Sequence, residues 1–182
     1  PAGDANNSAA ASAETDLHGA AIGGPFTLTD QDGKQRSWAD FKGRYRLVYF
    51  GYSFCPDVCP TTLAVMAQAL EKLGSKSQRI VPILVTIDPE RDTPQVLADY
   101  MIAFGPTFVG LTGSVEAIKD AEKKFRVYAV KKPLDPSKGS GGNYGVDHSS
   151  VLYLMGPDGK LVNFYDEAVS PDDLAKDLRQ RT

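Results

Sequence analysis

The only two cysteines of the chain, Cys55 and Cys59, lie in the stretch GYSFCPDVCPTTL, which runs from Gly51 to Leu63. Their spacing of four residues places both side chains on one face of a helix, with Cα atoms ~6 Å apart if the helix is regular. This separation is within the range that a disulfide tolerates, toward its long end. The pair is therefore able to cycle between dithiol and disulfide, and two thiolates are also able to bind one soft metal ion.

The surrounding sequence favours reactive thiols. The mostly apolar run Tyr45–Tyr52 predicts a buried strand that leads directly into the cysteines, and a helix is predicted after them with Pro60 in its first position. Unpaired N–H groups at the start of a helix stabilise anions, so we expect the pKa of both thiols to be lowered. The alternatives are two inert buried thiols or a structural disulfide, which would stabilise little because it closes a short loop.

Two thiolates rarely complete a metal site, so a third ligand is needed. The chain has two histidines, His18 and His148. His18 lies near a small, polar N-terminal stretch, whereas His148 lies where a loop meets a predicted core strand. Two thiolates and one imidazole suit copper(I), which prefers sulfur and accepts low coordination numbers. A structural zinc site would need both histidines, and their separation does not resemble zinc-finger spacing.

The composition is that of a globular domain with no nucleic-acid-binding face. The 182 residues are 42% apolar and 24% charged, with a net charge of -3 and no block of like charge. No apolar run approaches the ~18–20 residues that span a bilayer. We expect residues 1–16, which are small and polar, to be a disordered leader or the remnant of a tether. Residues 17–182 are predicted to form one domain.

Strands and helices alternate along the chain. We predict a β-hairpin around Asp32–Gly33, then strands separated by helices, then a second hairpin around Gly156–Gly159 and a closing helix. A strand that leads into a cysteine loop and a helix, with a late hairpin and a closing helix, is the thioredoxin arrangement. The predicted fold class is therefore α/β, a thioredoxin-like fold with a central mixed sheet flanked by helices and an extra N-terminal β-hairpin. In such a fold the late hairpin brings His148 close to the cysteine loop.

Two further stretches receive structural interpretations. Asp88, Glu90 and Asp92 lie in DPERDTP at the end of a predicted strand, an edge where ligands collect in open sheets. They could dock a partner or hold Arg91, but a turn followed by a helix start accounts for the motif more simply, and we favour it. The segment Pro133–Gly145 is rich in Gly, Pro and Ser and is predicted to be a mobile loop.

Three motifs together resemble the Sco (SenC) family of copper-binding, thioredoxin-fold cytochrome c oxidase assembly proteins. They are GYSFCPDVCPTTL, VTIDPERDTP (Val85–Pro94) and VDHSSVLYLMGPDG (Val146–Gly159), and they stand in the order and spacing of that family. The resemblance covers about Ile22 to Arg181. The cysteine spacing alone would be a weak signal, whereas its combination with Asp-His is specific.

The resemblance implies that Cys55, Cys59 and His148 bind copper(I), with copper(II) as a further state. It implies a metallochaperone that helps to assemble the dinuclear copper centre of cytochrome c oxidase. The implied partners are the copper-bearing subunit of the oxidase, other copper chaperones of the same compartment and a thioredoxin-like reductant. It also implies an N-terminal membrane tether, which we expect to be missing from this chain, and a domain in the bacterial periplasm or, alternatively, the mitochondrial intermembrane space.

A second hypothesis uses the same sulfurs. A thiol–disulfide oxidoreductase would keep the cysteines of a partner copper site reduced, would need Cys55 and Cys59, and would not need His148. The two roles are compatible, so we expect mainly a metallochaperone with reductase activity as a second role. A peroxiredoxin is disfavoured, because Tyr52 and Pro56 stand where such enzymes place a threonine three residues before the reactive cysteine. A domain with only a structural disulfide remains the third class.

Overall fold

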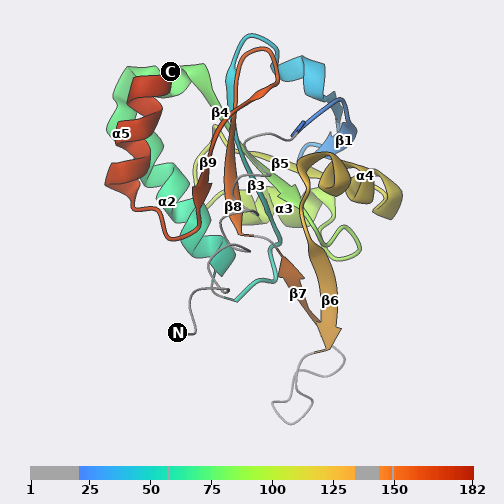
Figure 1. Cartoon of the computed structure of the whole chain (residues 1–182). Helices are drawn as coiled ribbons and strands as arrows, with labels where there is room; N and C mark the ends of the chain where they lie inside the picture. Colours follow the sequence, from blue (N-terminus) through green and yellow to red (C-terminus); the bar gives the residue numbers. More distant parts are fainter. Residues whose placement is uncertain (1–20, 57, 134–143, 149) are drawn as a thin grey trace, which may run out of the picture.

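A mixed sheet of seven strands forms the centre of the protein. The structure, a computed structural model, describes residues 21–56, 58–133, 144–148 and 150–182 (Figure 1). The strands are β1 (Thr27–Asp30), β2 (Gln35–Ser37), β3 (Tyr45–Gly51), β4 (Ile80–Thr86), β5 (Val109–Thr112), β8 (Val151–Met155) and β9 (Leu161–Asp166). Their order in the sheet is β2-β1-β5-β4-β3-β8-β9, with β3 parallel to β4 and antiparallel to β8. The predicted fold class and the N-terminal hairpin, β1–β2, are confirmed.

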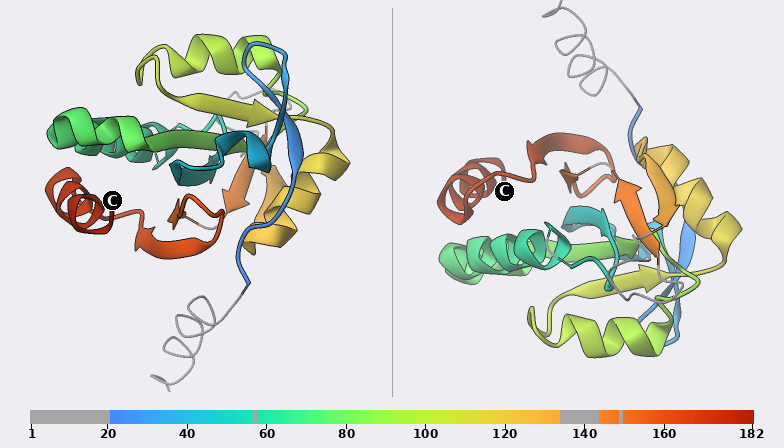
Figure 2. Two further views of the ribbon diagram at one scale, coloured as in Figure 1. Left: turned by 90° about the horizontal axis from the view of Figure 1, so that it is seen from above. Right: turned by 90° about the horizontal axis from the view of Figure 1, so that it is seen from below.

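Helices cover both sides of this sheet (Figure 2). They are α2 (Val58–Leu73), α3 (Pro94–Met101), α4 (Val115–Phe125) and α5 (Pro171–Arg181), with two 3₁₀ segments, η1 (Trp38–Phe41) and η2 (Gly74–Arg79). α2 and α5 lie side by side, at the left of Figure 1. None of the helices in the described part of the chain is long and apolar enough to span a membrane.

Hydroxyl side chains cap the starts of three of the helices. The side-chain oxygens of Thr93, Ser114 and Ser170 each accept a hydrogen bond from the backbone N–H three residues later, at 3.1 to 3.3 Å. The start of α2 differs from the prediction, because the helix begins at Val58 and not at Pro60. Its earlier start places Cys59 inside the first helical turn.

One strand lies outside the sheet that it was expected to join. β6 (Ala129–Pro133) pairs with β7 (Tyr144–His148) in a separate antiparallel sheet, below the main sheet in Figure 1. β1 accounts for this difference, because it pairs with β5 and occupies the edge of the main sheet that β6 would have extended. β7 was not predicted. The rest of the expected loop, residues 134–143, and the expected leader, residues 1–16, lie outside the described residues.

An aromatic cluster joins α4 to the sheet. The ring of Phe125, which is fully buried, lies 5.1 Å from that of Phe50 and 5.6 Å from that of Tyr153. It also contacts Trp38 at 5.7 Å and Phe26 at 6.3 Å, so the cluster connects strands, η1 and the N-terminal entry of the chain.

Replacing Phe125 with alanine will leave a cavity in this cluster. We expect Phe125→Ala to lower the free energy of unfolding by about 3–5 kcal/mol, through lost burial and incomplete collapse. Urea denaturation measures this difference. Ile102→Ala is the control, because Ile102 is 78% exposed and should change stability by no more than ~0.5 kcal/mol. Equal losses in the two variants would contradict the assignment of the core.

Candidate metal centre

The cysteines lie where β3 ends and α2 begins. Cys55 is half-buried in the connecting loop, and Cys59 is fully buried in the first turn of α2. Neither cysteine forms a disulfide. The backbone N–H of Cys59 donates to the Sγ of Cys55 at 3.4 Å, so the sulfur satisfies one of the N–H groups that the start of a helix leaves unpaired. This local contact fixes the relative position of the two residues.

The third predicted residue reaches the cysteines from β7. His148 is the last residue of that strand, and its Nε2 lies 3.7 Å from the Sγ of Cys59. The imidazole lies edge-on to the rings of Tyr49 and Tyr52, with ring centroids 6.1 and 6.0 Å away. His148, Cys55 and Tyr52 line a pocket of about 250 Å³ that is open to solvent. The structure therefore brings together residues that are separated by 89 positions in the sequence.

The three side chains fit a single soft metal ion. One ligand atom from each of Cys55, Cys59 and His148 lies within 4.8 Å of the other two. Two ligands with bonds of about 2.3 Å to sulfur and 2.0 Å to nitrogen are at most ~4.3 Å apart across one ion. The separation of 3.7 Å between Cys59 and His148 meets this limit without rearrangement. Two sulfurs and one imidazole nitrogen are a donor set that favours soft ions.

The electrostatics of the buried thiol differ from the prediction. The pKa of Cys59 is raised, chiefly by its hydrogen bond with Cys55 and then by burial. Burial also raises the pKa of Tyr49, whose hydroxyl lies 3.6 Å from the Sγ of Cys59. The expected lowering by the helix N-terminus is therefore wrong for Cys59, because desolvation and the neighbouring sulfur outweigh it. Metal binding at this thiol has to displace a proton.

A glycine permits the close approach of β3 to the thiol. A Cβ at Gly51 would lie 2.8 Å from the ring of Tyr49 and 3.0 Å from the Sγ of Cys59. Both distances are shorter than carbon tolerates, so any other residue would displace the tyrosine or the sulfur. The glycine in GYSFC is therefore part of the site.

Asp92 holds the cysteine loop in place, which the sequence analysis missed. Its buried carboxylate accepts hydrogen bonds from the backbone N–H of Ser53 at 3.0 Å and from the hydroxyl of Thr86 at 2.6 Å, and the Ser53 hydroxyl also donates to it. Thr93 and Pro94 do start α3, so the helix-start interpretation is confirmed for those residues. It is incomplete for Asp92. Asp92 stands directly before the cap residue Thr93, where acidic residues are common and usually exposed. Nothing in the sequence therefore indicates that this carboxylate is buried.

His18, the other histidine considered as a ligand, lies outside the described residues. Of the residues that the structure describes, Cys55, Cys59 and His148 form the group whose ligand atoms converge. Tyr49 and Tyr52, whose rings contact His148, were not predicted as site residues, although Tyr52 lies within the cysteine motif.

These features define a class of protein: a thioredoxin-like α/β domain in which a separate hairpin brings an imidazole to two thiols. The chain belongs to the SCO1/SenC family, whose family model matches residues 14–182. It is 45% identical to "Protein sco1" of Schizosaccharomyces pombe over 157 residues, which are 85% of this chain and 59% of that protein. The chain spans between 48% and 64% of the length of the first four curated relatives that it matches, several of which are named mitochondrial.

Solved structures of this family share the fold. The structure of Bradyrhizobium japonicum ScoI with copper bound superposes with a TM-score of 0.81 at 39% identity, covering 89% of this chain and 100% of that one. BsSco, described as a member of the Sco family of cytochrome c oxidase assembly proteins with a disulfide switch, superposes with a TM-score of 0.68. It is 31% identical, and the match covers 87% of this chain and 92% of that one.

The unequal burial of the two thiols predicts unequal reactivity. In the reduced, metal-free protein at pH 7, we expect iodoacetamide to modify Cys55 first and Cys59 slowly, because the raised pKa of Cys59 keeps it protonated. The rate at Cys59 should rise only as the pH is raised well into the alkaline range. Mass spectrometry of peptides after timed alkylation measures both rates. Faster modification of Cys59 at neutral pH would contradict the assigned electrostatics.

Proposed function

We propose that this domain is a copper metallochaperone that binds copper through Cys55, Cys59 and His148 and helps to assemble the dinuclear copper centre of cytochrome c oxidase. The observation that carries this proposal is the convergence of two sulfurs and one imidazole within 4.8 Å. Membership of the SCO1/SenC family and the copper-bound relative support it. Copper(I) is the state that this donor set suits best, and copper(II) is a second state.

The geometry suits transfer of copper more than permanent storage. Copper is the cargo, held by three ligands of which Cys55 and His148 are half-buried, so an incoming ligand can reach the ion. Two apolar side chains beside Cys55 are exposed, Phe54 by 55% and Val58 by 37%. They offer a contact surface next to the ion, where a partner can dock and take copper by stepwise exchange of sulfur ligands.

The proposed partners follow from this surface and from the family. They are the copper-bearing subunit of cytochrome c oxidase as recipient, other copper chaperones of the compartment as donors, and a thioredoxin-like reductant for the cysteines. We infer a location in the bacterial periplasm with an inner-membrane anchor, or alternatively in the mitochondrial intermembrane space. The names of the mitochondrial relatives support the mitochondrial alternative.

Loss of any of the three ligands should weaken copper binding. In an anaerobic copper(I) titration against a competing chelator, we expect Cys55→Ala, Cys59→Ala and His148→Ala each to reduce affinity at least about tenfold, or ~1.4 kcal/mol. X-ray absorption should show two sulfurs and one nitrogen in the wild type, and no nitrogen in His148→Ala.

Ser150→Ala is the matched control for this titration. Ser150 lines the same pocket as Cys55 and His148 but lies outside the group of convergent ligand atoms. The Ser150→Ala variant should therefore bind copper as tightly as the wild type. Unchanged affinity in His148→Ala would refute the three-ligand site.

A second function, thiol–disulfide exchange, is favoured by the proximity of the two cysteines, both in the thiol state. Because Cys55 is the more exposed, its thiolate would attack a partner disulfide and form a mixed disulfide. Cys59 would then attack the Cys55 sulfur and release the partner as a dithiol. Two electrons and two protons pass to the partner, and a Cys55–Cys59 disulfide remains. The disulfide switch described for BsSco supports this candidate.

His148 separates the two functions experimentally. We expect His148→Ala to keep the reduction potential of the Cys55–Cys59 pair within about 30 mV of the wild type, since this couple depends on the sulfurs. The same variant should lose copper affinity. Equilibration with glutathione or dithiothreitol buffers measures the potential. A large shift of potential in His148→Ala would mean that the imidazole also takes part in the redox chemistry.

A further inference from the structure

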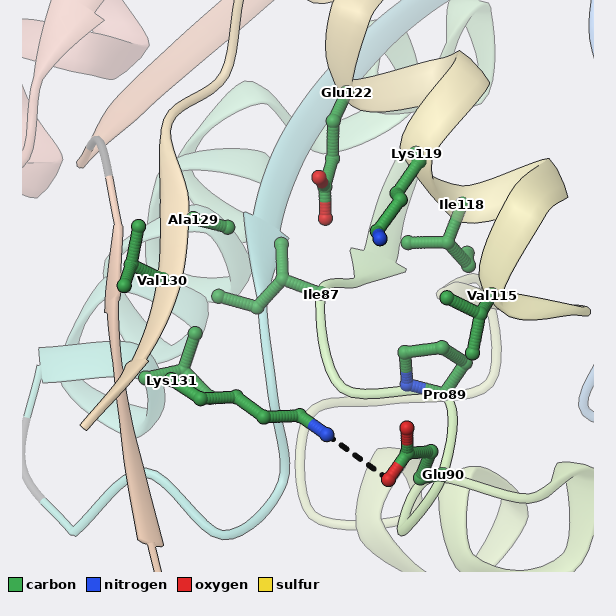
Figure 3. Close-up of a pocket in the computed structure, with 11 residues that line it drawn as sticks. Ile87, Pro89, Glu90, Val115, Ile118, Lys119, Glu122, Ala129, Val130 and Lys131 are labelled. Carbon is green, nitrogen blue, oxygen red and sulfur yellow. Dashed lines mark hydrogen bonds and ion pairs between the residues drawn. The ribbon is translucent and has the colours of Figure 1, made fainter. Parts of the chain in front are cut away.

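The hairpin that carries His148 lies apart from the main sheet and is held by contacts with neighbouring loops, among them a hydrogen bond of 3.1 Å from the backbone N–H of Val146 to the Tyr52 hydroxyl. β6 and β7 pair only with each other within the described residues, apart from the main sheet. A cavity of about 440 Å³ lies between β6, α4 and the loop after β4 (Figure 3). Val146 of β7 lines both this cavity and the pocket at the thiols. The position of His148 therefore depends on a few side-chain contacts.

The strongest of these contacts joins β7 to the loop after β4. The carboxylate of Asp88 is completely buried and accepts a hydrogen bond from the hydroxyl of Tyr144, the first residue of β7, at 2.6 Å. Its other oxygen pairs with the Nε of Arg91. A buried carboxylate is stable only if it is paired and hydrogen-bonded, so Asp88 constrains both partners.

Arg91 extends this contact to the cysteine loop. Its guanidinium lies over the ring of Tyr144 at 3.8 Å and over the ring of Phe54 at 4.7 Å. Phe54 is the residue before Cys55, whereas Tyr144 belongs to the hairpin. A planar cation between two aromatic faces attracts both, most strongly when partly desolvated. Arg91 thus bridges the two elements that supply the ligands.

A neighbouring ion pair contributes less. Lys131 of β6 pairs with Glu90 at 2.9 Å across the mouth of the cavity, drawn as a dashed line in Figure 3. Both side chains are more than half exposed, so the pair is screened and contributes little. This pair provides a matched control, because it joins the same loop to the same hairpin without burial.

We propose that Asp88 and Arg91 are positioning residues that hold the hairpin, and with it His148, against the cysteine loop. This inference rests on the proposed copper site. Neither residue belongs to the group of three converging ligands; Asp88 acts through Tyr144, and Arg91 acts through Tyr144 and Phe54. Outer contacts of this kind that orient a metal ligand commonly change metal affinity by 10–100-fold when they are removed.

Two variants test the proposal. Asp88→Asn keeps the shape but removes the charge, and Tyr144→Phe removes only the hydroxyl that donates to Asp88. We expect both to lower copper(I) affinity by about tenfold and to reduce the nitrogen contribution in the X-ray absorption spectrum. Glu90→Gln, the control, should behave like the wild type.

A copper-free measurement makes the inference independent of the proposed function. In the reduced apo protein, nuclear Overhauser contacts between the ring protons of His148 and Tyr52 should be present in the wild type and in Glu90→Gln. They should be weakened in Asp88→Asn and Tyr144→Phe, while thermal unfolding shows that Tyr144→Phe remains folded. This readout reports the position of the imidazole without any metal.

The outcomes separate the two claims. If both variants keep the ring contacts and bind copper with two sulfurs and one nitrogen, the positioning role is refuted and the copper site stands. If the wild type itself does not bind copper, the proposed function fails, and the ring contacts alone decide the positioning role. If Asp88→Asn does not fold, Tyr144→Phe decides it.

Discussion

The parallel pairing of β3 with β4 determines where the chemistry of this protein takes place. The two strands pair in register from Tyr45 opposite Ile80 to Gly51 opposite Thr86. The loops that follow them therefore both start at the same end of the sheet. The cysteine loop follows one strand and the DPERD segment follows the other. A hydrogen bond of 2.8 Å from the N–H of Ile87 to the carbonyl of Gly51 continues the pairing into the loops. Asp92 then joins the two loops through hydrogen bonds from Ser53 and Thr86, which fix the cysteine loop to the sheet.

The sequence predicts the strands and helices around the cysteine loop better than it predicts the hairpin of β6 and β7. The apolar run of β3, the strand that ends before DPERDTP and the helix start in that motif are local signals, and each is found where it was expected. β7 has no such signal, because its sequence YGVDH is short and follows a Gly-rich segment. The place of β6 outside the main sheet depends on β1, a strand about a hundred positions earlier that occupies the edge of β5. Periodicity reports which face of a strand is buried, but it does not report competition for a sheet edge.

Burial has opposite effects on the two chemistries of Cys59. A protonated thiol beside Tyr49 is a poor nucleophile, so Cys59 reacts slowly in the metal-free protein while Cys55 stays the more reactive thiol. The same proton has to leave when copper binds, so affinity depends on pH and on how well the ion compensates for the buried charge. A low thiol pKa, which the helix start alone predicts, would have made the empty site reactive. The sequence pattern identifies the two thiols, whereas burial and the neighbouring sulfur determine the protonation state of Cys59.

The division of the proposed ligands between two structural elements bears on how the proposed site would release an ion. The sulfurs belong to the loop and helix that follow β3, and loss of their geometry would disturb the core, because Cys59 is packed within it. The imidazole belongs to a hairpin with its own hydrogen bonds and a cavity behind it. Displacement of the hairpin would therefore remove one ligand and leave the main sheet intact. Such a displacement would take the proposed site from three ligands to two without unfolding, as the proposed exchange of copper with a partner requires.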